Sequence, residues 1–147
     1  MKTKISLISS LLLLALFGAA CGGRSAAVDS GAGSVDDQAS LVDALRAAGA
    51  TVEAGDSVEQ VFFAVKGQII QVNGADVQVF EYETAEAMEA EAAQVSSDGG
   101  SIGTSMVTWV AAPHFYKSGR ILVLYVGDDQ AVLDLLEAAL GPQFAGR

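Results

Sequence analysis

The sequence has one histidine, His114, and one cysteine, Cys21, among its 147 residues. A histidine can serve as a metal ligand or as a general base. A zinc site needs several nitrogen or sulfur ligands, and the chain has no second histidine or cysteine to supply them. We therefore expect a structural, hydrogen-bonded His114, and we expect no catalytic residue, no metal and no cofactor. A small hydrolase that uses His114, with or without a metal ion, is the alternative.

The segment from Ser97 to Thr104 is rich in glycine and serine, so its backbone N–H groups could form a nest for an anion. It lacks the lysine of a P-loop, and its glycines do not make a dinucleotide-binding fingerprint. The chain has no Gly-x-Ser-x-Gly elbow to present a nucleophilic serine. We therefore expect an ordinary connection here. The acidic pairs Asp36-Asp37 and Asp128-Asp129 indicate linker solvation and helix capping.

Aromatic residues gather around His114 in the chain, since Trp109, Phe115 and Tyr116 lie within five positions of it. In so small a domain most aromatic side chains should lie in the core. A subset that is exposed on a sheet face would instead form a binding surface. The candidate binding residues are Trp109, His114, Phe115 and Tyr116.

The charge balance excludes one class of partner. The chain has 18 acidic and eight basic residues, so its net charge is −10. Proteins that bind nucleic acids carry a basic surface that meets the phosphates. We therefore expect no nucleic-acid partner.

The first twenty residues have the pattern of a cleaved secretory signal peptide. Lys2 and Lys4 give a basic start, residues 5–17 are uncharged and mostly apolar, and small residues follow. An apolar run of this length is shorter than the roughly twenty residues that cross a bilayer. The run therefore predicts export rather than a spanning helix.

The segment Phe17-Gly18-Ala19-Ala20-Cys21 resembles the lipobox of bacterial lipoproteins, although Gly18 stands where that family usually has leucine. The resemblance implies cleavage before Cys21, acylation (palmitate or a similar chain) on its sulfur, and often acylation of its new amino group. Two or three chains hold a protein stably on a membrane, whereas one holds it only reversibly. We therefore expect a lipid anchor at Cys21 on the extracytoplasmic face of a bacterial membrane. The alternative is an ordinary cleaved signal in which Cys21 has no role.

Residues 21–39 are expected to form the lipidated cysteine and a flexible tether. Residues 22–39 are Gly, Ser, Ala and Asp-rich and contain no aromatic residue. Eighteen such residues have a root-mean-square reach of roughly 23 Å. After cleavage the chain keeps six basic and 18 acidic residues, a net charge of −12 that anionic headgroups repel. We therefore expect the domain to stand off the membrane.

Residues 40–147 are expected to form one α+β domain. The pattern predicts an antiparallel sheet of about five strands with helices packed on one face, in the order α-β-β-β-α-β-β-α. Asn73-Gly74 predicts a tight hairpin turn, and the alternation after it places Val77 and Val79 on one face, opposite Phe80. The expected strands are 61–65, 68–72, 76–82, 106–110 and 120–126, and the expected helices are 41–48 (capped by Ser40), 85–95 (capped by Thr84) and 130–140 (capped by Asp128 or Asp129).

This domain resembles a group of small secreted or lipid-anchored bacterial proteins without an assigned function, and that resemblance supplies no catalytic residue. It covers residues 41–147 and rests on the stretches 72–74, 79–82, 101–106, 113–116 and 124–127. The function that the sequence favours is a non-enzymatic lipoprotein of the cell envelope. It would bind a protein or a small molecule.

Overall fold

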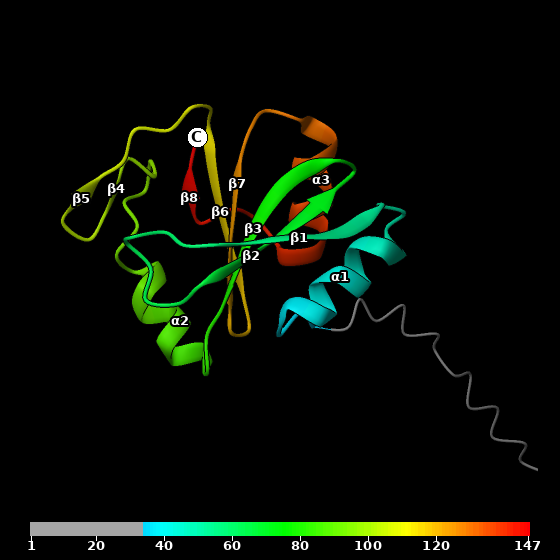
Figure 1. Cartoon of the computed structure of the whole chain (residues 1–147), viewed down its shortest axis with the longest axis horizontal. Coiled ribbons are helices and arrows are strands. Elements are labelled where there is room, and N and C mark those ends of the chain that lie inside the picture. The colour runs from blue at the N-terminus through cyan, green and yellow to red at the C-terminus, as the bar shows by residue number, and fades with distance from the viewer. Residues whose placement is uncertain (1–33) are drawn as a thin grey trace, which may run out of the picture.

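The computed structural model describes residues 34–147 and has the expected α+β architecture. Six strands form one antiparallel sheet in the order β1-β2-β3-β7-β6-β8, and β4 pairs with β5 in a separate small hairpin (Figure 1). The expected signal peptide, Cys21 and residues 22–33 lie outside the described residues. The helices are α1 (Gln38–Ala47), α2 (Ala85–Ala92) and α3 (Gln130–Leu140), and the strands are β1 (Val52–Val58), β2 (Gly67–Val72), β3 (Ala75–Glu81), β4 (Ser101–Ile102), β5 (Ser105–Met106), β6 (Pro113–Ser118), β7 (Ile121–Val126) and β8 (Ala145–Gly146).

Strands β3 and β7 lie at the centre of the sheet and are apolar on both faces. Val79 pairs with Val123 on one face, and Phe80 pairs with Leu122 on the other. All four side chains are at most 1% exposed. Burying one such side chain contributes roughly 1.5–3 kcal/mol of hydrophobic free energy. The sheet therefore has two apolar faces, and both must be covered.

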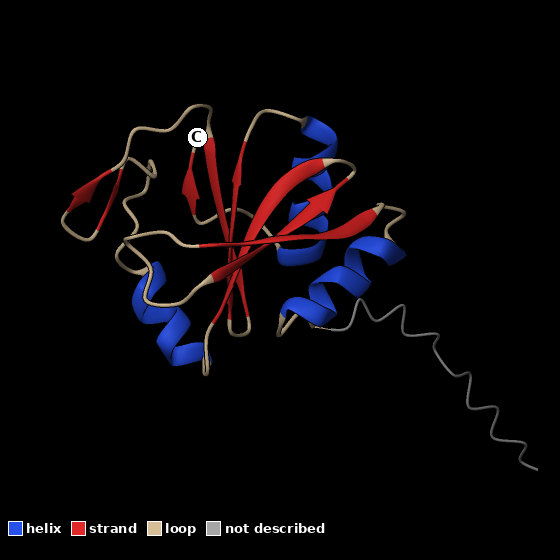
Figure 2. Ribbon diagram, viewed as in Figure 1, coloured by secondary structure: helices blue, strands red, loops and turns tan. Residues whose placement is uncertain are grey.

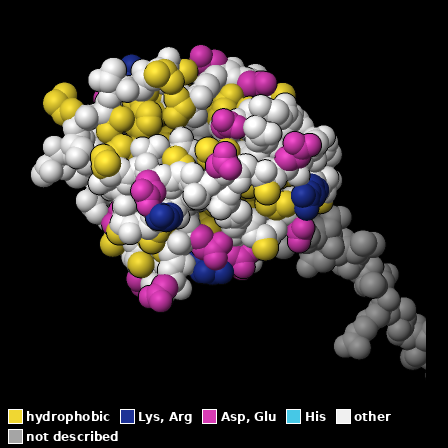
Figure 3. Space-filling model, viewed as in Figure 1, with side chains coloured by type: hydrophobic (Ala, Val, Ile, Leu, Met, Phe, Trp, Pro, Cys, Tyr) yellow, Lys and Arg dark blue, Asp and Glu magenta, His cyan; other side chains and the backbone are white. Residues whose placement is uncertain are grey.

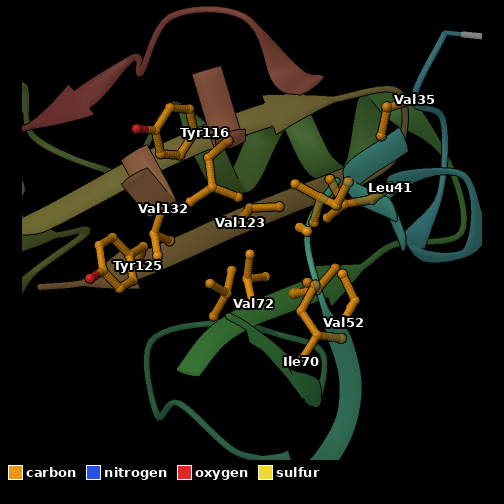
Figure 4. Packing of buried hydrophobic residues seen from close by; sticks show 14 of the residues in the cluster. Val35, Leu41, Val52, Ile70, Val72, Tyr116, Val123, Tyr125 and Val132 are labelled. Carbon is orange, nitrogen blue, oxygen red and sulfur yellow. The ribbon is translucent and has the colours of Figure 1, made fainter. Parts of the chain in front are cut away.

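Helices cover both faces, so the expectation that they all pack on one face is wrong. Helices α1 and α3 cover the face that carries Val79 and Val123 (Figure 4). Helix α2 covers the opposite face, where Met88 packs with Phe80 (Figure 2). The physical reason is the alternation of β3 and β7, because a single helical layer would leave half of their apolar side chains in water.

Residues 34–39, expected in the tether, are part of the folded domain. Val35 is 3% exposed and packs in the same cluster as α1. Its carbonyl accepts a hydrogen bond from Ser118 Oγ at 2.5 Å, and the Asp36 carbonyl accepts one from the Arg120 N–H at 2.9 Å. The domain therefore extends ahead of the expected start at Ser40.

Short polar side chains begin all three helices. The N-cap of α1 is Asp37 rather than Ser40, which lies at the third helical position and completes a capping box with it. Thr84 caps α2 and Asp129 caps α3, as expected. Helix α2 ends at Ala92 instead of position 95, because Val95 forms a β-bridge with Ile102.

The edge of the sheet differs from the expected one. The expected strand 61–65 is a turn segment that packs Phe63 against Phe80, with ring centroids 4.6 Å apart. Its place beside β2 is taken by β1, which is not among the expected strands. Strand β1 lacks an apolar alternation because it is an exposed edge interrupted by an irregularity between Ala54 and Ser57. Within the expected strand 106–110, only Met106 is in a strand.

The turn between β2 and β3 is the predicted Asn73-Gly74 hairpin. Both residues have positive φ, 52° for Asn73 and 85° for Gly74, as a type I′ turn requires. The turn sets the register in which Val72 pairs with Ala75 and Ile70 with Val77.

Among the described residues, no helix has the length and apolar composition that crossing a membrane requires.

We expect Gly119→Ala to destabilise the domain more than Gly74→Ala does. Both glycines have positive φ, so both substitutions carry the left-handed strain of about 1–2 kcal/mol. A Cβ at Gly119 would lie 2.3 Å from Asp36 Cα, whereas one at Gly74 would meet open space. Overpacking adds about 1–3 kcal/mol, so urea titration should show a lower free energy of unfolding for Gly119→Ala by that amount. Equal losses would contradict the packing of residues 34–36 on the β6–β7 turn.

Candidate functional site

His114 lies on β6 and is 6% exposed. Its Nδ1 is 2.6 Å from Gln143 Oε1, and its ring stacks on Tyr125 with centroids 6.1 Å apart. Because an amide oxygen only accepts, Nδ1 carries the hydrogen of this bond. Within residues 34–147, the buried Nε2 has no hydrogen-bond partner. The expected hydrogen bond is therefore present, and its partner is an amide.

No nucleophile or metal site assembles around His114 in the described part of the chain. Its ring is hydrogen-bonded to Gln143 and stacked on Tyr125, and neither of these residues is a carboxylate, a serine or a thiol. Residues 34–147 contain no group of three or more His, Cys, Asp or Glu side chains placed to hold a metal ion. A general base needs a substrate proton within hydrogen-bonding reach, and this ring is enclosed.

The four predicted binding residues do not share one surface. Phe115 is fully buried on the α2 face, between Trp109 and Phe144, with ring centroids 5.8 and 6.2 Å away. Tyr116 is 3% exposed and packs on the α1 and α3 face (Figure 4). Because neighbouring residues of a strand point to opposite faces, Phe115 and Tyr116 cannot line one surface. Of the four, Trp109 alone is partly exposed.

Trp109 is held with one edge in the core and the other at a cleft. Its Nε1 donates to the Gly99 carbonyl at 2.7 Å, and its ring meets Phe62 edge-on at 6.1 Å between centroids. The cleft beside it has a volume of about 390 Å³. Its lining residues are Gly100, Val107, Thr108, Trp109, Ala111, Ala112, Pro113 and Arg147.

Two exposed apolar side chains are next in sequence to residues that line this cleft. Met106 is 92% exposed and Val110 is 100% exposed. We call Met106, Val107, Trp109 and Val110 the Trp109 surface. Figure 3 shows apolar side chains gathered on the side of the molecule that carries β4 and β5. Sequence reasoning missed Met106, Val107 and Val110 because it placed them in a strand, and an apolar run does not itself show which members are exposed.

The glycine-rich segment satisfies its own donors. Asp98 Oδ1 accepts from the Gly100 N–H at 2.9 Å and from Ser96 Oγ at 2.7 Å. These hydrogen bonds, with the backbone one the larger cause, lower the pKa of the Asp98 carboxyl below its usual value. An internal carboxylate thus occupies the position an anion would take. This agrees with the expected ordinary connection, although the segment also contains β4.

Tyr82 is a second buried polar group without a partner. Its hydroxyl is enclosed and makes no hydrogen bond within the described residues. Burial, and to a smaller degree the negative charge of Glu91, raises the pKa of this phenol well above its usual value. The folded domain therefore disfavours ionised Tyr82.

We expect Tyr82→Phe to raise the free energy of unfolding by about 1 kcal/mol, because it removes an unsatisfied buried hydroxyl. The matched change Tyr116→Phe should have a smaller effect, since that hydroxyl is not an enclosed group without a partner.

A raised pKa of Tyr82 in the folded state means that the folded state keeps the phenol proton to a higher pH than the unfolded state does. Stability from this group is thus present below about pH 10 and falls as the pH rises further. Thermal unfolding from pH 8 to 11 should show a shallower alkaline loss in Tyr82→Phe, and identical pH profiles would rule out this role.

No protein-family model matches this chain, and comparison with curated proteins and with solved structures gives no match either.

Proposed function

We propose that the protein is a non-enzymatic lipoprotein of the bacterial cell envelope, anchored at the extracytoplasmic face of a membrane through Cys21. The position of Cys21 carries the proposal. The only cysteine follows directly on the small residues that end a short apolar run. Twelve residues separate it from Ser34, the first residue that the structure describes.

The charge of the domain fits a body held away from lipid headgroups. Residues 34–147 carry 17 acidic and five basic side chains, a net charge of −12. Three of the five basic side chains, Lys66, Lys117 and Arg120, form ion pairs with carboxylates. An acidic domain gains nothing from approaching an anionic bilayer, so attachment is assigned to the covalent lipid.

The role assigned to the domain is binding. The Trp109 surface supports it, because Met106 and Val110 keep apolar side chains in water beside a cleft. Exposed apolar surface of this kind is typical of interaction sites. The partner would be a protein or a small molecule. The alternative, a hydrolase that uses His114, draws no support from the enclosed ring and its amide partner.

We expect Cys21→Ser to release the protein from membranes and to leave the precursor uncut, since both lipid attachment and the resemblance to a lipobox depend on this cysteine. The measurement is fractionation of cells into membrane and soluble parts, with the mass of the chain read by mass spectrometry. Ser25→Ala is the matched control, because it changes one hydroxyl nearby and should leave both partition and processing intact. If the Cys21→Ser chain is processed at the same site and stays with membranes as wild type does, the lipid anchor is wrong.

A further inference from the structure

The backbone beside the Trp109 surface is open. Among residues 34–147, the N–H and C=O groups of residues 108–111 have no hydrogen-bond partner. The bonds on either side are made, since the Val107 N–H donates to Gly100 and the Ala112 carbonyl accepts from Gly127. Apolar side chains and unpaired main-chain groups therefore occur together along one short exposed segment.

The exposed apolar side chains could be covered either by a lipid bilayer or by a polypeptide, and the unpaired main-chain groups beside them favour the polypeptide. The hydrocarbon of a bilayer offers no hydrogen-bond partner, so burial of these main-chain groups in it is costly. A polypeptide can cover Met106 and Val110 and also pair with the open N–H and C=O groups. The segment is thus suited to a peptide rather than to lipid.

The position of the cleft can be given relative to the chain's entry into the domain. Residues 35 and 36 bind the β6–β7 turn, whereas Pro113, at the other end of β6, lines the cleft. A six-residue strand separates these ends by roughly 17 Å. Figure 1 shows the start of α1 beside that turn, with the segment before β6 at the opposite end of the sheet. The cleft therefore lies at the end of the sheet opposite to the chain's entry into the domain.

The charge of the domain opposes two other occupants of the cleft. A net charge of −12 disfavours contact with anionic lipid, and it disfavours pairing with a second copy of the same domain.

We infer that the cleft beside Trp109, at the end of the sheet opposite to the chain's entry, binds an apolar peptide segment of a partner protein. Apolar side chains of the segment enter the cleft beside Val107 and Trp109. Its main chain pairs with groups of residues 108–111. The inference names the class of partner for the binding role proposed above and rests on that role.

The test uses the full-length lipoprotein in phosphatidylcholine vesicles, with Trp109 as the reporter because it is the only tryptophan. The probes are acetyl-Lys-Val-Thr-Val-Thr-Val-Lys-amide and its versions with Leu or Phe in place of Val. Each has a matched peptide that is N-methylated at alternate backbone amides. A second set of vesicles contains brominated phosphatidylcholine, which quenches a tryptophan that enters the bilayer.

We expect at least one peptide to change the emission of Trp109 saturably. Its N-methylated form should bind at least tenfold more weakly, and Val110→Asp should weaken binding by at least tenfold. Val61→Asp is the matched control, because Val61 is 98% exposed and lies outside the segment 106–111, and it should bind within twofold of wild type. Brominated lipid should leave the emission unchanged.

Four results would overturn the inference. Quenching by brominated lipid would make the surface a membrane contact, and an emission change with protein concentration alone would make it a contact between copies. Equal binding of the N-methylated peptides, or no saturable peptide at all, would remove the peptide site. The peptide results do not depend on Cys21, because Trp109 reports binding whether or not the protein is lipidated. The lipid anchor therefore stands or falls separately in the fractionation of Cys21→Ser.

Discussion

The central strand pair, β3 with β7, imposes the constraint on which the rest of the fold depends. Each strand places large apolar side chains on both faces, as Phe80 and Val79 do in β3. Both faces therefore need a cover. The chain leaves β3 into α2 and leaves β7 into α3, and these two helices settle on opposite faces. The helices that follow the two central strands, α2 after β3 and α3 after β7, thus cover opposite faces of the sheet.

Local chemistry made much of this arrangement predictable. Asn73-Gly74 admits positive φ at low cost, and Thr84 and Asp129 supply the oxygen that a helix N-terminus needs. The continuous apolar run of β7 predicted a strand buried on both faces. The same run also implied that both faces of the sheet need a covering layer. The helices were nevertheless expected on one face, because the sequence alone does not show to which face a chain turns after a strand.

Features that depend on distant partners could not be predicted. Strand β1 is exposed and largely polar, and it is a strand because β2 offers it an edge. The apolar residues 61–65 form a turn segment instead of a strand, and Phe63 serves as part of the cover on Phe80. Val35 was expected in the flexible tether. In the structure the carbonyls of Val35 and Asp36 accept hydrogen bonds from residues of the β6–β7 turn. Tertiary contacts overrode local preference in each case.

The candidate site was likewise predictable in part from local sequence and in part dependent on tertiary contacts. The sequence located the aromatic segment, and Trp109 is in it, but the alternation of β6 buries Phe115 and Tyr116 on opposite faces. What reaches the surface is the segment before β6, where no strand partner is present among the described residues. Phe115 of β6 packs edge-on against the Trp109 ring, and the Gly99 carbonyl, in the turn before β4, accepts a hydrogen bond from its Nε1. An ordered core thereby supports an exposed apolar edge.

The most direct test of the central constraint is native-state hydrogen exchange of the lipoprotein, resolved by peptide. The two-sided pair predicts that amides of β3 and β7 exchange slowest, only through global unfolding, while the unpaired amides of residues 108–111 exchange within seconds. If β3 and β7 exchanged as fast as the edge strand β1, they would not form the stable centre of the sheet, and the explanation of the helices on both faces would fail.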